Sequence, residues 1–119
     1  MEVDSTAFIA RTKAYSLRII RLIDSLPKDD VARTLGHQLL RAGCSVSANY
    51  RAAGRAKSRA DFIAKMAIVE EECDETLHWL ELLVDSGRIK AVKVNLLKQE
   101  GAEILAMVVA SIRTAKARR

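Results

Sequence analysis

A carboxylate and an imidazole stand three residues apart in the sequence, at Glu75 and His78. On a helix this spacing puts both side chains on one face, and di-iron bundles combine two such units with further glutamates to hold metal. The only other histidine is His37, and the residue three positions before it is Thr34. The helices expected near the two ends of the chain add no inward pair of acids. Because half a ligand set does not hold a metal usefully, we expect no metal site and no cofactor.

Nucleophilic chemistry has two candidate thiols, Cys44 and Cys73. Neither has a base close in sequence, and both fall on the predicted inner faces of helices, where a thiol remains protonated and unreactive. The Gly-Arg-Ala-Lys stretch at 54–57 lacks the spacing of a phosphate-binding loop. We therefore expect free cysteines in the core, no disulfide and no catalytic residues, so the chain is predicted not to be an enzyme.

Polar residues on two neighbouring helices are expected to form a structural network, and they are Gln38, Arg41, Ser45, Asn49, Glu72 and Glu75. If the helices on either side of a turn near residue 57 run antiparallel, Arg41 lies opposite Glu72 and Glu75. One guanidinium can bind two carboxylates and so fix the register of the helix pair. The alternative is that these charges face solvent. We expect Arg41, Glu72 and Glu75 to be buried and to hold the helices together, so that Arg41→Ala lowers the thermal midpoint clearly, since removal of one partner of a buried charge network costs about 3–5 kcal/mol.

Basic residues gather in two segments, with Arg51, Arg55, Lys57 and Arg59 in the first and Arg113, Lys116, Arg118 and Arg119 in the second. The first segment spans the predicted turn between the second and third helices, and the second is the C-terminal end of the chain. In an up-down bundle these two positions share one end with the N-terminus. Such a surface attracts the phosphate backbone of nucleic acid, although helix C-termini favour Lys and Arg in any case.

Charge is strongly segregated along the chain, and the net charge of +5 conceals it. Residues 1–27 sum to +1, residues 28–60 to +5, residues 61–87 to −7 and residues 88–119 to +6. One acidic segment thus lies between two basic ones. This arrangement suits helix pairing within a subunit as well as recognition of an anion.

Four periodic segments must position these residues. Apolar side chains recur at spacings of three and four over about residues 5–26, 30–53, 59–86 and 91–115, which is the pattern of amphipathic helices. The chain of 119 residues contains one proline and five glycines, so the elements are expected to be few and long. Short connections make neighbouring helices antiparallel. Residues 1–119 are therefore predicted to form a single all-α domain, an antiparallel up-down-up-down four-helix bundle.

The expected helix limits depend on particular side chains. Asp29 or Asp30 is positioned to cap the second helix, and Ser58 with Asp61 resembles a capping box for the third. Gly87 suits the left-handed conformation that ends many helices. The second helix is expected to turn Val31 inward as the first member of its apolar face.

Further apolar residues fall outside the main inner faces of the second and fourth helices, namely Leu40, Tyr50, Leu96, Leu105, Met107 and Val109. A second apolar stripe favours self-association into a closed homo-oligomer. The alternative is one wide apolar face within a subunit. No apolar run approaches the roughly 20 residues needed to span a bilayer, and no signal peptide is recognisable, so a cytoplasmic location without membrane contact is expected.

Several stretches resemble a known family, namely residues 38–42 (QLLRA), 45–52 (SVSANYRA), 55–58 (RAKS), 61–65 (DFIAK), 71–76 (EECDET) and 79–83 (WLELL). They are similar to the bacterial four-helix-bundle family of 23S ribosomal RNA intervening-sequence proteins. The similarity is close over the second and third helices and holds only in pattern over the first and fourth. Many members have a glutamate three residues after the asparagine, where this chain has Ala52.

The resemblance implies an up-down bundle, a ring-shaped homopentamer with a central channel, and no enzymatic activity. It also implies a relation to accessory proteins of diversity-generating retroelements, which bind a reverse transcriptase and nucleic acid. The sequence therefore predicts a non-catalytic, homo-oligomeric accessory protein that binds RNA or DNA through basic surfaces. The alternative is a protein-protein adaptor or scaffold with an acidic partner and no direct nucleic-acid contact.

Overall fold

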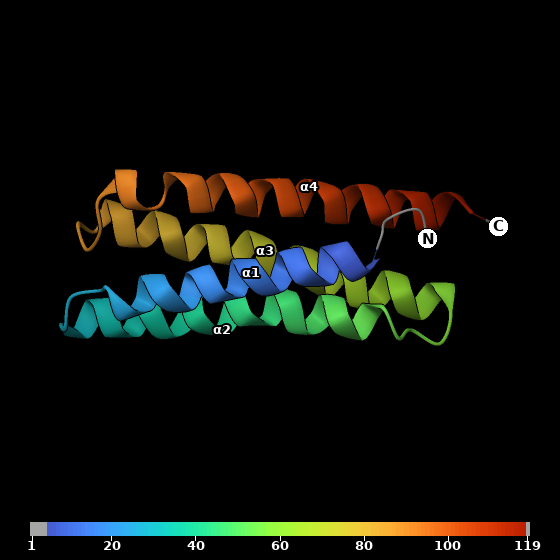
Figure 1. Cartoon of the computed structure of the whole chain (residues 1–119), viewed down its shortest axis with the longest axis horizontal. Coiled ribbons are helices and arrows are strands. Elements are labelled where there is room, and N and C mark those ends of the chain that lie inside the picture. Colours follow the sequence, from blue (N-terminus) through green and yellow to red (C-terminus); the bar gives the residue numbers. More distant parts are fainter. Residues whose placement is uncertain (1–4, 119) are drawn as a thin grey trace.

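The computed structural model describes residues 5–118, and four long helices dominate it (Figure 1). They are α1 (Ser5–Asp24), α2 (Asp30–Ala53), α3 (Arg59–Asp85) and α4 (Asn95–Ala117), with a short 3-10 helix η1 (Ala91–Lys93) before α4. Each helix packs against the next in the chain, and α4 returns beside α1 with fewer contacts. The molecule measures 50 × 22 × 20 Å. The predicted all-α, antiparallel up-down-up-down four-helix bundle is confirmed.

Specific side chains set the helix limits close to those predicted. Asp29 caps α2 by accepting a hydrogen bond from the Ala32 N–H at 2.9 Å. Ser58 caps α3 by accepting one from the Asp61 N–H at 3.1 Å. Gly87 has a φ of +76° after the end of α3, the left-handed conformation that glycine adopts without strain. These short polar contacts satisfy backbone groups that a helix terminus leaves unpaired.

The observed helix limits differ from the predicted ones at four places. Helix α1 ends at Asp24 rather than near residue 26, α3 ends at Asp85 rather than near residue 86, and α4 ends at Ala117 rather than near residue 115. Helix α4 begins at Asn95 rather than at residue 91, because residues 91–93 form the separate turn η1. Val94 follows this turn and is fully buried. Because the Val94 side chain packs into the core, the connection between α3 and α4 forms a tight turn, and α4 starts only after it.

The core runs the length of the bundle and follows the three-and-four rhythm predicted for each helix. Residues of α3 such as Met66, Val69, Cys73 and Leu80 are fully buried. The prediction that Val31 turns inward was wrong. Val31 is 43% exposed, and the buried residue at the start of α2 is Ala32. The inner face of α2 is thus rotated by one residue at its first turn.

Small residues allow α1 and α2 to approach closely. A Cβ atom added to Gly43 would lie 2.9 Å from both Cγ atoms of Ile19. The Ser16 hydroxyl donates to the Gly43 carbonyl at 2.7 Å and lies 2.7 Å from the Ser47 hydroxyl. Glycine in a helix interior costs about 1 kcal/mol relative to alanine. At Gly43 this cost is offset because the missing side chain lets α1 and α2 pack closely.

Within residues 5–118, no helix combines the length and the apolar character required to cross a bilayer.

Candidate nucleic-acid interface

One end of the bundle collects most of the predicted basic residues. The turn between α2 and α3 and the C-terminal end of α4 lie together there, beside the start of α1 (Figure 1). We call this surface the basic end, and it comprises Arg51, Arg55, Lys57, Arg59, Arg113, Lys116 and Arg118. The predicted Arg119 lies outside the described residues.

The turn that carries the first basic cluster is held by its own hydrogen bonds. The Gly54 N–H donates to the Tyr50 carbonyl at 3.2 Å as α2 ends. The Lys57 N–H donates to an Asp61 carboxylate oxygen at 3.0 Å. The Lys65 ammonium contacts both Asp61 oxygens at 2.7 Å. A short, internally bonded turn therefore presents its basic side chains from a fixed backbone.

The two basic clusters contact each other directly. The Arg59 guanidinium donates to the carbonyl oxygen of Arg118, which joins the start of α3 to the end of α4. The structure thus brings together two segments that lie more than fifty positions apart in the sequence.

Among the described residues, the charge of the α2–α3 turn and of the end of α4 is almost uncompensated. Asp61 is the only acid among residues 51–65 and 110–118. The hydrogen bond from Lys65 is the main reason that the pKa of Asp61 lies below its usual value, so the carboxylate is ionised and already neutralised by its neighbour. In the described part of the chain, no ion pair engages the exposed side chains of Arg51, Arg55, Lys57, Arg113 and Lys116. A positive potential therefore extends from this surface.

The predicted polar network forms in two separate pieces. Arg41 of α2 donates to two carboxylates of α3, with Nη1 3.3 Å from Glu72 and Nη2 bonded to Glu75. Its Nε atom also donates to Gln38 at 3.2 Å. Away from this group, the Asn49 amide donates to the Ser45 carbonyl at 2.9 Å and to its hydroxyl at 2.8 Å. The second piece is therefore local to α2 and does not join the helices.

The expected burial was wrong for Arg41. Its side chain is 49% exposed, although its guanidinium reaches Glu72 and Glu75 of α3, whose side chains are 17% and 34% exposed. An exposed ion pair contributes about 0.2–1 kcal/mol, so the stabilisation expected for a buried network does not apply. Sequence reasoning also missed Trp79, whose indole N–H donates to Glu75 at 3.1 Å. Its position one helical turn after Glu75 was the available signal.

A second ion-pair cluster, also missed, joins α1 to α4. Arg11 donates to Glu100 through Nε and Nη2, each at 2.8 Å, and Nη2 also contacts Glu103 at 2.8 Å. Its Nη1 lies 3.1 Å from the Met107 sulfur. The hydrogen bond from Arg11 is the main reason that the pKa of Glu100 is lowered. The spacing of these three α4 residues along one helical face was the sequence signal, and the cluster bridges α1 and α4, which contact each other less than consecutive helices do.

The residues considered for metal and thiol chemistry are occupied by structural contacts. Glu75 binds Arg41 and Trp79, and His78 stacks edge-on against Trp79 with ring centroids 5.0 Å apart. Burial is the main cause that raises the pKa of Cys73 to about 12, and burial also raises the pKa of Cys44. Both thiols therefore remain protonated at neutral pH. Among residues 5–118, no three His, Cys, Asp or Glu side chains converge as a metal site would require.

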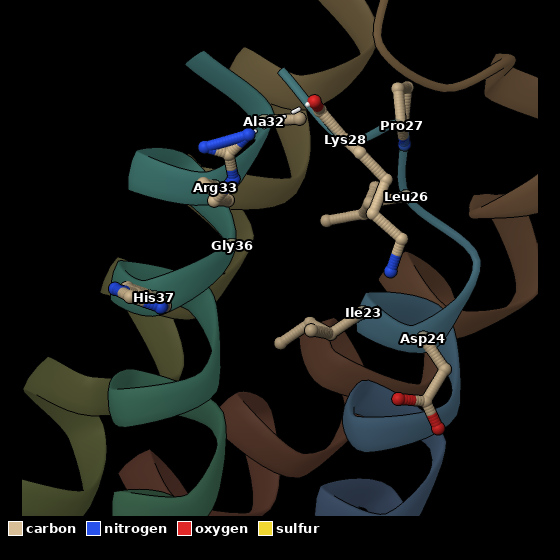
Figure 2. A pocket seen from close by; sticks show the side chains of 9 residues that line it. All are labelled: Ile23, Asp24, Leu26, Pro27, Lys28, Ala32, Arg33, Gly36 and His37. Carbon is tan, nitrogen blue, oxygen red and sulfur yellow. Dashed lines mark hydrogen bonds between the residues drawn. The ribbon is translucent and has the colours of Figure 1, made fainter. Parts of the chain in front are cut away.

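A pocket of about 270 Å³ lies at the opposite end of the bundle, at the connection between α1 and α2. Figure 2 shows its apolar wall of Ile23 and Leu26 and the charged Asp24, Lys28 and Arg33 around it. The Arg33 guanidinium is already bonded to the Lys28 carbonyl at 3.1 Å and to Asp30 at 3.2 Å. The pocket is therefore separate from the basic end, and the Arg33 guanidinium beside it is already hydrogen-bonded within the turn between α1 and α2.

Comparisons with known proteins agree with the resemblance seen in the sequence. The family model described as 23S rRNA-intervening sequence protein matches residues 6–110. The chain is also similar to the crystal structure of a protein with unknown function from the S23 ribosomal protein family of Bacteroides thetaiotaomicron. That structure shares 33% sequence identity over 87% of this chain and 96% of its own, with a TM-score of 0.82. No curated protein matches the chain.

Proposed function

Because the chain belongs to the 23S rRNA-intervening sequence protein family, we propose that it is a non-catalytic accessory protein that binds RNA or DNA through its basic end. The family name associates its members with sequences inserted in ribosomal RNA, so an RNA-related role is the starting point. We also propose a cytoplasmic location and a closed homo-oligomer. The resemblance implies five subunits for this oligomer and a reverse transcriptase as a further partner.

The observation that carries this proposal is the convergence of two basic clusters on one surface. The contact from Arg59 to the Arg118 carbonyl joins them, and the one acid among residues 51–65 and 110–118, Asp61, is neutralised by Lys65. Phosphate groups approaching this end therefore meet several exposed cations and no free carboxylate of that turn. Neutralisation of phosphates by Lys and Arg supplies most of the affinity in sequence-independent binding.

Two aromatic residues at this end, Phe8 and Tyr50, are buried and a third, Phe62, is partly buried against the core, which favours backbone contact over base recognition. Phe8 and Tyr50 pack edge-to-face with ring centroids 4.6 Å apart, and their side chains are buried. Neither ring is available for the base stacking by which many proteins hold single strands. We therefore expect binding without strong sequence preference. Repetition of the basic end around an oligomer would raise avidity, provided that one nucleic acid reaches several subunits.

Binding of labelled RNA and DNA over a salt series tests the proposal. The test variant replaces Arg55, Lys57 and Lys116 with Gln. The matched control replaces Lys28, Lys90 and Lys93, three exposed cations at the opposite end. Each variant loses three positive charges, so only the position of the charges differs.

We expect the native protein to bind more weakly as salt rises, with log affinity falling linearly against log salt. The slope should become shallower by about 2–3 in the test variant, since each phosphate contact contributes roughly 0.7–0.9. The control should retain most of the native slope. Equal losses in the two variants would mean that net charge, rather than the basic end, drives binding. No binding at low salt would leave the adaptor with an acidic protein partner as the better proposal.

A further inference from the structure

Three of the five acidic residues of α3 that take part in no ion pair with another described residue border a groove between α3 and α4. This groove of about 350 Å³ is lined by Ala67, Glu70, Glu71, Asp74, Leu105 and Val109, and we call it the acidic groove. Glu71 and Asp74 are exposed. None of its three carboxylates forms an ion pair with another of the described residues. The groove therefore offers an apolar floor beside uncompensated negative charge.

Helix α1 carries a surface of the opposite character. Leu17 and Ile20 are large apolar side chains that remain 42% and 38% exposed. Lys13 and Arg21, one helical turn before Leu17 and one after it, are exposed cations without an ion pair among residues 5–118. We call these four residues the α1 ridge.

We propose that the α1 ridge of one copy of this chain docks into the acidic groove of the next copy. Leu17 and Ile20 would cover Leu105 and Val109, while Lys13 and Arg21 would approach the carboxylates of the groove. This inference rests on the self-association in the proposed function and names the surfaces that carry it. Complementary charge of this kind selects a partner and fixes its orientation.

The two surfaces cannot meet within one molecule. Helix α1 packs between α2 and α4, and α3 lies across the bundle from it. The α1 ridge is the part of α1 that faces away from the core, whereas the acidic groove opens on the outside of the α3 and α4 pair. A second copy is therefore required to bring them together.

The contact must also be head-to-tail. Two acidic grooves facing each other would place like charges together, and so would two α1 ridges, which disfavours a symmetric contact of one surface with itself. Contacts between two different surfaces generate rings when the rotation between neighbours closes. The docking mode thus agrees with a closed assembly rather than a simple dimer.

Substitution of Leu17 with Glu tests the docking surface. Leu17 is partly exposed, so the change leaves the core of the subunit intact while placing a negative charge against the acidic groove. Val92→Glu is the matched control, because Val92 is 75% exposed and lies in η1 at one end of the bundle, away from both surfaces. Circular dichroism of both variants checks that the helices persist, and multi-angle light scattering measures the mass.

We expect Leu17→Glu to reduce the assembly to monomers at micromolar concentration and Val92→Glu to keep the native mass. If the native protein and Leu17→Glu form the same oligomer, this docking mode is wrong while self-association stands. A native protein that is monomeric would instead overturn the assembly in the proposed function.

Chemical cross-linking tests the same contact without disrupting it. In a Cys44→Ser background, Lys13→Cys and Asp74→Cys are introduced together or singly, and a short bifunctional thiol reagent is added. Cys73 is fully buried and does not compete. We expect a ladder of covalent multimers from the double variant and none from either single variant. Cross-linked dimers from a single variant would show a symmetric contact and overturn the head-to-tail arrangement.

Discussion

Replacement of Gly43 with Ala should destabilise the bundle even though it removes a glycine from the middle of a helix. The added Cβ would lie 2.9 Å from Ile19 Cγ1, 2.9 Å from its Cγ2 and 3.2 Å from its Cβ. Ile19 is fully buried, and all three atoms lie close to its backbone. Because a β-branched side chain on a helix has one strongly preferred rotamer, relief requires that α1 and α2 move apart.

The expected size of the effect is the difference between two terms. Helix propensity favours Ala over Gly by about 0.8–1 kcal/mol. Overpacking of a close helix contact typically costs about 1–3 kcal/mol. The hydrogen bonds that join the Ser16 hydroxyl to the Gly43 carbonyl and to the Ser47 hydroxyl would also lengthen if the helices separate. We therefore expect the free energy of unfolding to fall by roughly 1–2 kcal/mol.

Gly36→Ala is the matched control on the same helix. Its added Cβ would meet only the terminal Cδ1 atom of Leu26, at 3.2 Å, and that methyl group can shift by side-chain rotation. The propensity gain should prevail, so this variant should be about as stable as the native protein or up to 1 kcal/mol more stable. Urea unfolding at one fixed protein concentration measures both, because the proposed self-association would make stability depend on concentration. If the two variants shift in the same direction by the same amount, the steric argument is refuted.

Two further predictions concern Arg41 and Cys73. Arg41→Ala should lower the free energy of unfolding by no more than about 1 kcal/mol in urea unfolding, because the side chain is 49% exposed and exposed ion pairs contribute little; a loss of 3 kcal/mol or more would mean that it behaves as a buried group. Burial raises the pKa of Cys73 from 9.0 in the unfolded chain to about 12 in the fold. The stabilisation that the neutral thiol contributes to the folded state is therefore complete below pH 9, and it is lost as the pH rises from 9 towards 12. Cys73→Ala should therefore show a shallower decline of stability than the native protein over that interval, by at most about 1.4 kcal/mol per pH unit, and equal slopes would contradict the assignment.

The sequence predicted the fold well because the relevant signals are local and repeated. The three-and-four rhythm identified four helices, and residues of α3 and α4 that recur at this spacing, such as Val69, Cys73, Ile104 and Val108, are buried. The caps at Asp29 and Ser58 and the left-handed Gly87 were also predicted. Each of these features depends on residues within one or two turns of one another, so no knowledge of distant contacts is needed.

The errors in the fold arise where tertiary packing overrides the local pattern. Val31 continues the apolar rhythm of α2 but is exposed, because the first turn packs through the smaller Ala32. Tyr50 was assigned to a second, outward stripe, yet it is buried against Phe8 of α1. A one-residue shift in the inner face is invisible to periodicity when apolar residues occupy adjacent positions.

Ion pairs across helices were predicted less well than the core. The partners of Arg41 followed from the antiparallel register of α2 and α3, but its exposure did not, because a long flexible side chain can reach a partner from the outer surface. The contact of Arg11 with Glu100 and Glu103 was missed because α1 and α4 are distant in sequence. Their register depends on three intervening connections rather than on one turn.

Outward-facing residues mark the limit of inference from periodicity. A helical pattern separates inward from outward positions, but it does not say what covers an outward apolar residue such as Leu17. The structure adds the missing information by showing which charges surround it and which surface elsewhere has the complementary charge. Lys13 and Arg21 beside Leu17, and unpaired carboxylates beside Leu105, define such a pair. The charge segregation seen along the sequence can therefore be interpreted only in three dimensions, where part of the acidic segment lines the groove that we propose as the docking site for another copy of the chain.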